Sequence, residues 1–409
     1  MQFTNNEVIV RKISFNAPIS GYEALRLTGL ELITESNSFG LMICGIGGLG
    51  DPAGSCFSSG FWSSYYWDGT TWATYMVGAE DSIINDGAVE LWSWQPGFVS
   101  LNLPSTRPFT AAANGLEWLQ SQQSATDGGY GNSSGSVETL LALGANKLKA
   151  DEWRRQPNSP SLLNYVLTNG AAFANSNVAA SGKLAVSLAS ANSCWPPEAK
   201  QPLNYSATGA FSSGGGPQAW AILGTRALSQ SIPALAAQNL RGLAQPNGGW
   251  EWSPTWGTDT NSTALAIQAI LAAGEPSSSS AIVNGLNYLD KAQNSDGGFP
   301  YDPDSTFDTT SDANSTAYVI QALLAAGQVP TSTRWTTGSG KTPLSYLLSR
   351  QLSNGSFEWQ AGQGADQVAT RQAVPALLGQ PFPLQPSELH QCSEQEMGLS
   401  NVYLPLLVK

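Results

Sequence analysis

A unit of two helices recurs six times between residues 116 and 380, and this repeat constrains the fold more than any other feature of the chain. Each unit has a first helix with polar flanks, a glycine-rich turn that ends in an aromatic residue, a loop, and a second helix rich in alanine and leucine. The turns are marked by residues 127–130, 169–173, 209–211, 247–250, 296–299 and 354–357. Their aromatic residues lie about 40 to 60 positions apart, which is the period of arrays of helical hairpins.

The second helix of each unit is predicted to be buried. In two units it begins with short polar residues, at 259–263 and 312–316, and continues into the nearly identical segments 267–274 and 320–327. Such residues cap helix N-termini, and a helix that is apolar nearly all round belongs inside a protein. Six first helices outside and six second helices inside predict a closed (α/α)6 toroid. An open solenoid is the alternative, but it needs polar capping repeats, and the last unit is still apolar at 376–378.

Residues 1–100 have a different pattern and are predicted to form a small α+β domain. Residues 7–15 and 90–94 have the pattern of strands, and residues 20–27 begin with a serine cap and have the pattern of one short helix. The pair Asp68-Gly69, between aromatic-rich flanks, indicates a β-hairpin.

The domain organisation follows from these two patterns. Residues 101–112 are predicted to be a linker, residues 113–383 the toroid, and residues 384–409 a C-terminal tail whose last apolar run, 402–409, is too short to span a bilayer. The predicted fold class is therefore a multidomain chain, with a small α+β domain followed by an all-α toroid.

Composition limits the partners and the location. The 409 residues carry a formal net charge of −12, so nucleic acid and anionic membrane surfaces are poor partners. Charged residues make up 12% of the chain, about half the usual fraction. Because serine, threonine, asparagine and glutamine supply the polar surface instead, an extracellular or cell-surface protein is predicted. No signal peptide is recognised at residues 1–4, and no transmembrane segment is expected.

The four cysteines are interpreted in pairs. Cys44 and Cys56 lie in one glycine-rich loop, so a disulfide between them is predicted, with buried thiols as the alternative. For Cys194 and Cys392 the sequence leaves the pairing open. No metal site is expected, because no cysteine pair has zinc-ligand spacing and the single histidine, His390, falls in the tail.

Two sets of residues are candidates for binding a ligand. Nine aromatic residues fall between positions 61 and 94, and those not needed for the core of the small domain would form an exposed binding face. The inner helices would bring six N-termini, with free N–H donors and short polar side chains, to one mouth of the ring. The predicted ligand-binding residues are Trp67, Trp72, Tyr75, Asp259, Asn261, Ser262, Asp312, Asn314, Ser315, Asp366 and Gln367.

The repeat resembles the prenyltransferase/squalene-oxidase repeat of the terpenoid cyclase-like α/α toroids, over residues 116–380. The segments 20–25, 72–78 and 86–92, with the Cys44–Cys56 loop, resemble the β-domain of transcobalamin- and intrinsic-factor-like proteins. Those carriers combine such a domain with an α6/α6 ring in the opposite order and hold cobalamin between the two. The resemblance thus implies cobalamin, or a similar large polar molecule, as ligand and implies no other cofactor.

The residues do not match the enzymes that share this fold. Squalene-hopene-type cyclases need an Asp-x-Asp-Asp acid, and the nearest string is taken to be Asp302-Pro303-Asp304-Ser305. Protein prenyltransferases need an Asp/Cys/His zinc site. Terpene cyclase and prenyltransferase activities are therefore predicted to be absent.

A glycosidase with two carboxylates remains an alternative function. Glu138, Asp259, Asp312 and Asp366 all lie at or near starts of inner helices, although helix capping is the favoured explanation for them. The leading prediction is a non-catalytic extracellular binding protein for a small molecule or saccharide. A carbohydrate-active enzyme and a surface assembly protein with a protein partner are the alternatives.

Overall fold

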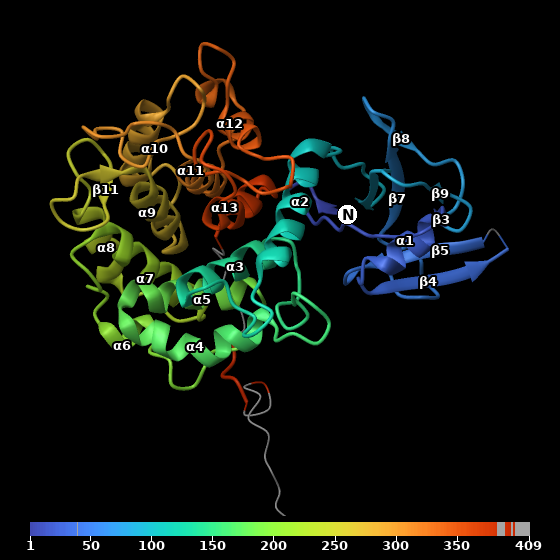
Figure 1. Ribbon diagram of the computed structural model, residues 1–409, viewed down its shortest axis with the longest axis horizontal. Coiled ribbons are helices and arrows are strands. Elements are labelled where there is room, and N and C mark those ends of the chain that lie inside the picture. Colours follow the sequence, from blue (N-terminus) through green and yellow to red (C-terminus); the bar gives the residue numbers. More distant parts are fainter. Residues whose placement is uncertain (39, 383–388, 394–395, 397–409) are drawn as a thin grey trace, which may run out of the picture. The chain divides into compact units, whose positions relative to one another are not determined.

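A computed structural model describes residues 1–38, 40–382, 389–393 and 396 of the chain. The chain divides into two compact units, Met1–Ala113 and Asn114–Lys409 (Figure 1). Most of the predicted tail 384–409, including its apolar run at 402–409, lies outside the described residues. None of the described helices is long and apolar enough to cross a membrane.

The first unit is a small α+β domain, as predicted. Its main sheet has the strand order β2-β1-β10-β7-β8, and β4, β5 and β6 form a second, antiparallel sheet. The elements are β1 (Gln2–Thr4), β2 (Glu7–Val8), β3 (Ile19–Ser20), α1 (Gly21–Leu27), β4 (Leu32–Asn37), β5 (Gly40–Ile46), β6 (Leu49–Gly50), β7 (Gly60–Trp67), β8 (Trp72–Thr74), β9 (Ile83–Ile84) and β10 (Glu90–Pro96).

The aromatic residues of this unit divide between core and periphery. Trp62, Trp92 and Trp94 are buried in one cluster with residues of α1 and β5. The hairpin at Asp68-Gly69 is confirmed, because β7 and β8 pair with Trp67 opposite Trp72. The long strand predicted at 7–15 is wrong: only Glu7–Val8 is a strand, after which the ladder ends.

The second unit is a closed ring of two helix layers, which confirms the predicted toroid (Figure 1). Each inner helix contacts the next one in sequence, and α13 contacts α3, so the circle closes and the open-solenoid alternative is excluded. The inner helices are α3 (Ser133–Ala145), α5 (Val178–Ser190), α7 (Gly215–Ala227), α9 (Thr260–Ala272), α11 (Ala313–Ala325) and α13 (Gln367–Leu377). The outer helices are α2 (Thr106–Gln122), α4 (Leu162–Ser176), α6 (Pro202–Tyr205), α8 (Ala234–Gly242), α10 (Ser280–Ala292) and α12 (Pro343–Ser349).

Three short elements complete this unit. They are β11 (Trp250–Glu251), β12 (Thr258–Asp259) and the 3-10 helix η1 (Thr333–Trp335). Helix α2 begins at Thr106, within the segment 101–112 that was expected to be a linker, so this segment is helical over more than half its length.

A recurring hydrogen bond explains why each repeat combines an aromatic residue after the turn with short polar residues at the start of the inner helix. The backbone N–H groups of Trp250, Phe299 and Phe357 donate to threonine hydroxyls in the first turn of the inner helix that follows, over 2.9–3.0 Å. All three aromatic rings are fully buried. The aromatic residue therefore fixes the loop to the core, and the hydroxyl satisfies a backbone donor that burial would otherwise leave unpaired.

One predicted turn is wrong. Residues 169–173 lie inside α4, which runs to Ser176, and Asn177 alone separates α4 from α5. A Cβ at Gly170 would come into contact with Leu184 of α5. This glycine therefore allows close packing of two helices and does not mark a turn.

Candidate active site on the axis of the ring

The inner helices can be compared position by position, because each begins at a defined N-cap. The N-cap residues are Asn132, Asn177, Gly214, Asp259, Asp312 and Asp366. Residues at the same offset from these caps lie at the same level of the ring. The residues six positions after the N-caps are Glu138, Lys183, Trp220, Leu265, Tyr318 and Gln372.

Four polar side chains of this level and its neighbour converge on Glu138. Its Oε1 accepts hydrogen bonds from Tyr318 Oη over 3.1 Å and from Gln372 Nε2 over 2.8 Å. Lys183 Nζ lies 3.1 Å from Oε1, and Arg371 Nε lies 3.5 Å from Oε2. The residues come from α3, α5, α11 and α13, so the fold assembles the cluster from four separate repeats.

Burial and charge set the protonation states in this cluster. Burial alone would raise the pKa of Glu138, but Lys183 and Arg371 outweigh it and the pKa is lowered, so the carboxylate is ionised. Burial, and then the charge of Glu138, raise the pKa of Tyr318 well above its ordinary value. Tyr318 is therefore a neutral donor beside an ionised acceptor. The Lys183 side chain is 16% exposed, so water reaches the edge of the cluster.

An aromatic floor lies beside the polar cluster. Phe382, which is 3% exposed, packs against Trp220 of α7 and Tyr318 of α11, with ring centroids 5.1 and 5.6 Å apart. Its backbone N–H donates to Gln268 of α9 over 3.0 Å. Phe382 therefore contacts three inner helices, two of them at the level of Glu138 and one at Gln268, three positions nearer the helix C-termini.

Three shielded amide oxygens lie at the level of Glu138 or nearer the helix N-termini. Asn261 Oδ1, Asn314 Oδ1 and Gln372 Oε1 are inaccessible to solvent and have no hydrogen-bond partner among the described residues. Asn261 and Asn314 stand one helical turn before Leu265 and Tyr318, and residues one turn apart share a helix face. A ligand with hydroxyl or N–H groups can donate hydrogen bonds to these oxygens only when the side chains that cover them move aside.

The predicted mouth residues lie where the sequence placed them, in the first turns of α9, α11 and α13. Asp259, Asp312 and Asp366 cap these helices, with oxygens 2.6–2.7 Å from backbone N–H groups. Burial raises the pKa of Asp259 and of Asp312 to about 6. The capping explanation is thus confirmed for all three. A ligand contact by these residues, or by Asn261, Ser262, Asn314, Ser315 and Gln367, stays a prediction.

Two of the predicted aromatic residues of the small unit, Trp72 and Tyr75, use their polar ends within that unit. Trp67 and Trp72 stack edge to face, and Trp72 Nε1 donates to the carbonyl oxygen of Pro104 over 2.8 Å. Tyr75 donates to Glu90 over 2.8 Å, and burial raises the pKa of Glu90 to about 7. A role of Trp67, Trp72 and Tyr75 in binding stays a prediction.

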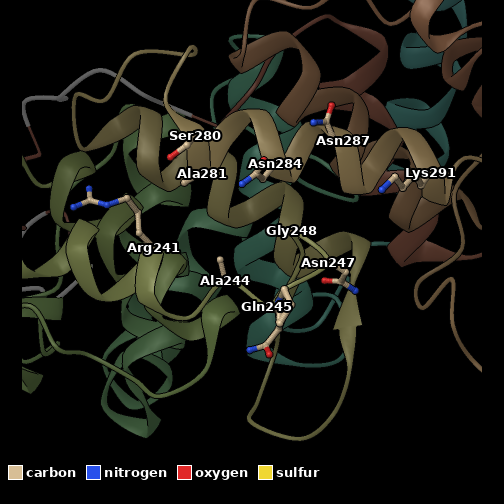
Figure 2. Close-up of a pocket in the computed structure, with 11 residues that line it drawn as sticks. Arg241, Ala244, Gln245, Asn247, Gly248, Ser280, Ala281, Asn284, Asn287 and Lys291 are labelled. Atoms are coloured by element: carbon tan, nitrogen blue, oxygen red, sulfur yellow. The ribbon is translucent and has the colours of Figure 1, made fainter.

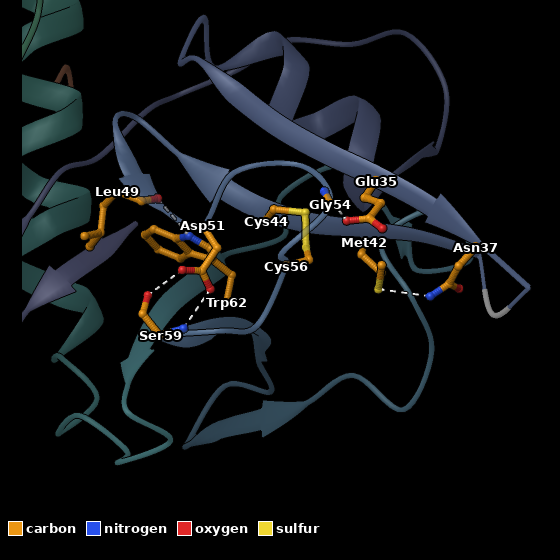
Figure 3. Close-up of a disulfide and its surroundings, with 10 residues drawn as sticks. All are labelled: Glu35, Asn37, Met42, Cys44, Leu49, Asp51, Gly54, Cys56, Ser59 and Trp62. Atoms are coloured by element: carbon orange, nitrogen blue, oxygen red, sulfur yellow. Dashed lines mark hydrogen bonds between the residues drawn. A yellow bond between two sulfur atoms is a disulfide. The ribbon is translucent and has the colours of Figure 1, made fainter.

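Both cysteine pairs form disulfides. Cys44–Cys56 is confirmed, beside a loop in which Ser59 donates two hydrogen bonds to Asp51 (Figure 3). Cys194 and Cys392, whose pairing the sequence left open, are bonded across 198 positions of the chain.

A polar groove of about 530 Å³ lies on the outer face of the ring, between the end of α8, the turn 244–248 and α10 (Figure 2). Many of its polar groups already have partners. Arg241 pairs with Glu275, Asn287 accepts from Arg334, and Asn247 bonds to Thr258. These bonds occupy three of the polar side chains that line the groove.

Sequence reasoning named Glu138 but missed the residues around it. Lys183, Tyr318, Arg371 and Gln372 are separated from it by 45 to 234 positions. Aligning the six second helices on their capping residues would have placed Lys183, Tyr318 and Gln372 at its level. No comparable signal exists for Phe382, which follows the last repeat.

Comparison with known proteins supports the toroid. Residues 198–368 match the squalene-hopene cyclase C-terminal domain, a stretch that covers less than half of the chain. A search of curated proteins gives no match. The ent-copalyl diphosphate synthase of Streptomyces platensis is similar, with 14% identity, a TM-score of 0.41 and coverage of 60% of this chain and 49% of the synthase. This chain thus spans about half the length of that synthase.

A second similar structure is the type II terpene cyclase MstE of Scytonema, with 13% identity, a TM-score of 0.49 and coverage of 67% of this chain and 98% of the cyclase. A protein from Actinoplanes has 14% identity, a TM-score of 0.43 and coverage of 66% and 98%. These likenesses carry no inference about activity.

The match over residues 198–368 corrects the predicted function. The repeats from α6 to α12 are similar to a domain of an enzyme family, which overturns the prediction of a non-catalytic binding protein. The string at 302–305 keeps the first and third residues of Asp-x-Asp-Asp, with Ser305 in place of the fourth. The segments 259–262 and 312–315 each keep the first residue of Asp-x-Asp-Asp, but Asn261-Ser262 and Asn314-Ser315 replace its last two acids.

Proposed function

We propose that this protein is an enzyme that performs acid–base chemistry on a neutral small molecule at the axis of the ring. The observation that carries the proposal is the convergence of an ammonium, a guanidinium, a phenol and an amide on the Glu138 carboxylate. Leu265 occupies the equivalent position of α9 and is buried there. The fold therefore tolerates an apolar side chain at this level and does not require a charged one.

Stability alone is a weak explanation for such a cluster. Buried ion pairs lose about as much free energy by desolvation as they gain by attraction, and apolar replacements of similar size are often neutral or stabilising. Perturbed ionisable groups that meet in the interior are enriched at functional sites. A catalytic role for Glu138 and Tyr318 is therefore the better explanation.

The protonation states assign a role to each group. Ionised Glu138 accepts a proton from the substrate, and neutral Tyr318 turns its hydroxyl from Glu138 to donate a hydrogen bond to the substrate. Lys183 and Arg371 stabilise negative charge that develops on a substrate oxygen. None of these groups is a strong acid, so protonation of an isolated alkene is not part of the proposal.

The substrate class follows from two features of the site. The aromatic floor of Trp220 and Phe382 suits an unsaturated hydrocarbon chain. The shielded oxygens of Asn261 and Asn314 suit a hydroxyl group or another donor. The match to the squalene-hopene cyclase domain supports an isoprenoid. We therefore propose an isoprenoid alcohol or aldehyde, and neither a saccharide nor a protein partner enters the proposal.

The test uses three probes: geranylgeraniol, geranylgeranial and squalene. The wild-type protein should convert the alcohol or the aldehyde, but not squalene, as followed by gas chromatography with mass spectrometry. Glu138→Gln should lower the rate by about 10²- to 10⁴-fold, the usual contribution of a general acid or base. Tyr318→Phe, which removes a single hydroxyl, tests the same cluster with less risk to folding.

Glu358→Gln is the matched control. Glu358 is 8% exposed and lies 3.2 Å from Arg350, so this variant also loses a buried ion pair, but outside the ring axis. It should keep the wild-type rate. Failure of folded wild-type protein to convert either oxygenated probe, or an unchanged rate in both Glu138→Gln and Tyr318→Phe, would refute the proposal.

We also propose that the Met1–Ala113 unit is a domain of the transcobalamin-like type and that the protein is exported. Two disulfides support export, because such bonds persist in oxidising compartments. The proposal attaches no ligand to this likeness. Detection of the native protein in the culture medium, with both disulfides formed, would support it, and retention inside the cell would contradict it.

A further inference from the structure

Four side chains with metal-binding atoms meet where the C-terminal segment lies beside the residues that follow α5. The ligand atoms of Cys194, His390 and Glu396 all lie within 4.8 Å of one another, and Cys392 is bonded to Cys194. His390 Nε2 lies 2.9 Å from Glu396 Oε1. Two thiolates, an imidazole and a carboxylate are ligand types of four-coordinate zinc sites.

The backbone holds these residues together without help from the disulfide. The N–H of Trp195 donates to the carbonyl oxygen of His390 over 2.7 Å, and the N–H of Cys392 donates to the carbonyl oxygen of Trp195 over 2.9 Å. Trp195 is 1% exposed, so this pairing is anchored in the core. Opening the S–S bond would therefore leave the two sulfur atoms close to each other.

Burial and orientation also fit a metal site. Cys194 and Cys392 are 3% and 6% exposed, whereas the side chains of His390 and Glu396 are 61% and 41% exposed and border solvent. Ser393 donates two hydrogen bonds to Glu396 Oε2, which orients the carboxylate so that Oε1 lies next to the imidazole. Partners of this kind commonly position metal ligands.

The distances require only small movements. Ligand atoms of one tetrahedral zinc ion lie about 2.0–2.3 Å from the ion and therefore about 3.3–3.8 Å from one another. The ligand atoms of Cys194, His390 and Glu396 already lie within 4.8 Å of one another and need shifts of about 1–2 Å at most, whereas the Cys392 sulfur atom must move away from that of Cys194 once the S–S bond is broken.

We propose that reduction of the Cys194–Cys392 disulfide creates a zinc-type metal site with Cys194, Cys392, His390 and Glu396 as ligands. A dithiol reductant supplies two electrons and two protons, the S–S bond breaks into two thiols, and the reductant becomes a disulfide. A divalent zinc ion then displaces the two thiol protons and binds both thiolates. The ion thereby stabilises the reduced state, so metal and oxidant compete for the same sulfur atoms.

The other disulfide is a natural comparison within the same chain. The ligand atoms of Glu35, Cys44 and Cys56 also lie within 4.8 Å of one another. No imidazole can complete that group, because His390 is the only histidine in the chain and lies beside Cys194. Metal ions should therefore favour reduction of Cys194–Cys392 and have little effect on Cys44–Cys56.

The test reduces the full chain with a phosphine, which takes an oxygen atom from water and leaves no competing thiol. Cobalt(II) is then added as the probe. One equivalent should give a thiolate-to-cobalt charge-transfer band and the visible bands of tetrahedral cobalt, and zinc should abolish both. The signal should persist in C44S/C56S and disappear in C194S/C392S. His390→Ala and Glu396→Gln should each weaken cobalt binding by at least about 10-fold.

A second measurement tests the coupling between metal and reduction. Zinc at about 100 times its Kd should shift the ratio of dithiol to disulfide by about 100-fold at Cys194–Cys392, as read by alkylation and mass spectrometry. The proposal fails if reduced, folded wild-type protein gives no cobalt signal, if C194S/C392S gives the same signal, or if His390→Ala binds cobalt as tightly as wild type.

Discussion

Two capping aspartates show how the same residue type acquires different properties in this ring. Asp259 and Asp312 each accept a hydrogen bond from the backbone of the first helical turn, which favours the carboxylate. Both are also almost fully buried, and burial favours the neutral acid more strongly, so the pKa rises from 3.8 to about 6. The sequence can predict the cap, but only the packing around it decides the charge.

The raised pKa values predict a pH dependence of stability. Well below pH 4 both residues are protonated in the folded and the unfolded chain. Between pH 4 and pH 6 the unfolded chain ionises first, so the free energy of unfolding falls as pH rises, by at most about 3 kcal/mol per residue. Asp312→Asn keeps a capping side chain that cannot ionise, so its stability relative to wild type should increase over this range.

Urea unfolding of wild type and Asp312→Asn at several pH values between 4 and 7 measures this difference. Asp259→Asn repeats the test in the preceding repeat. A stability difference that does not change with pH in either variant would contradict the prediction.

Helices of this ring were predictable from the sequence because each repeat contains its own start, stop and buried face. The caps at Asp259 and Asp312, the apolar second helices and the plug aromatic Phe299 are local signals. The turn predicted at Gly170 failed for a physical reason, since a glycine can serve either a turn or a close helix contact. A single sequence does not distinguish the two.

The candidate site was less predictable than the helices that carry it. Glu138 was visible as an acid near a helix start, but its partners Lys183 and Arg371 lie on other repeats. Only closure of the ring brings α13 beside α3, and that contact places Arg371 against Glu138. Phe382 lies outside every repeat, so no periodic signal marks it as the floor of the axis.

Adjacent inner helices approach closely at glycines, which gives a test of packing. A Cβ at Gly182 of α5 would collide with the backbone of Trp220 in α7, whereas a Cβ at Gly242, at the end of outer helix α8, would meet no atom within 4 Å. Gly182→Ala should therefore destabilise the ring by about 1–3 kcal/mol or more. Gly242→Ala should be neutral or stabilise it by up to about 1 kcal/mol.

Thermal or urea unfolding of both variants, followed by circular dichroism, checks this pair. The two substitutions are chemically identical, so a difference between them reports the surroundings of each position. Equal stability of the two variants would show that α5 and α7 do not pack as closely as described.

At the scale of the whole molecule, each unit has its own core and its own disulfide. The first unit contains a buried cluster around Trp62 and Trp94, and Cys44–Cys56 closes a loop of 12 positions. In the second unit, Cys194–Cys392 spans 198 positions, from the end of α5 to beyond α13. Because α13 packs on α3, separating any two neighbouring inner helices breaks the ring, so the second unit should unfold as one cooperative body.

These loop lengths predict unequal effects of the two disulfides. A cross-link stabilises mainly by restricting the unfolded chain, and this effect grows with the logarithm of loop length. Replacement of both cysteines by serine should cost about 5 kcal/mol for the 198-position loop and about 3 kcal/mol for the 12-position loop. In calorimetry without reductant or metal, C194S/C392S should lower the melting transition of the ring, and C44S/C56S only that of the small unit. A cooperative unit that loses its longest cross-link gains entropy in its unfolded state, so its melting temperature must fall. An unchanged transition of the ring in C194S/C392S would therefore show that the ring does not unfold as a single body.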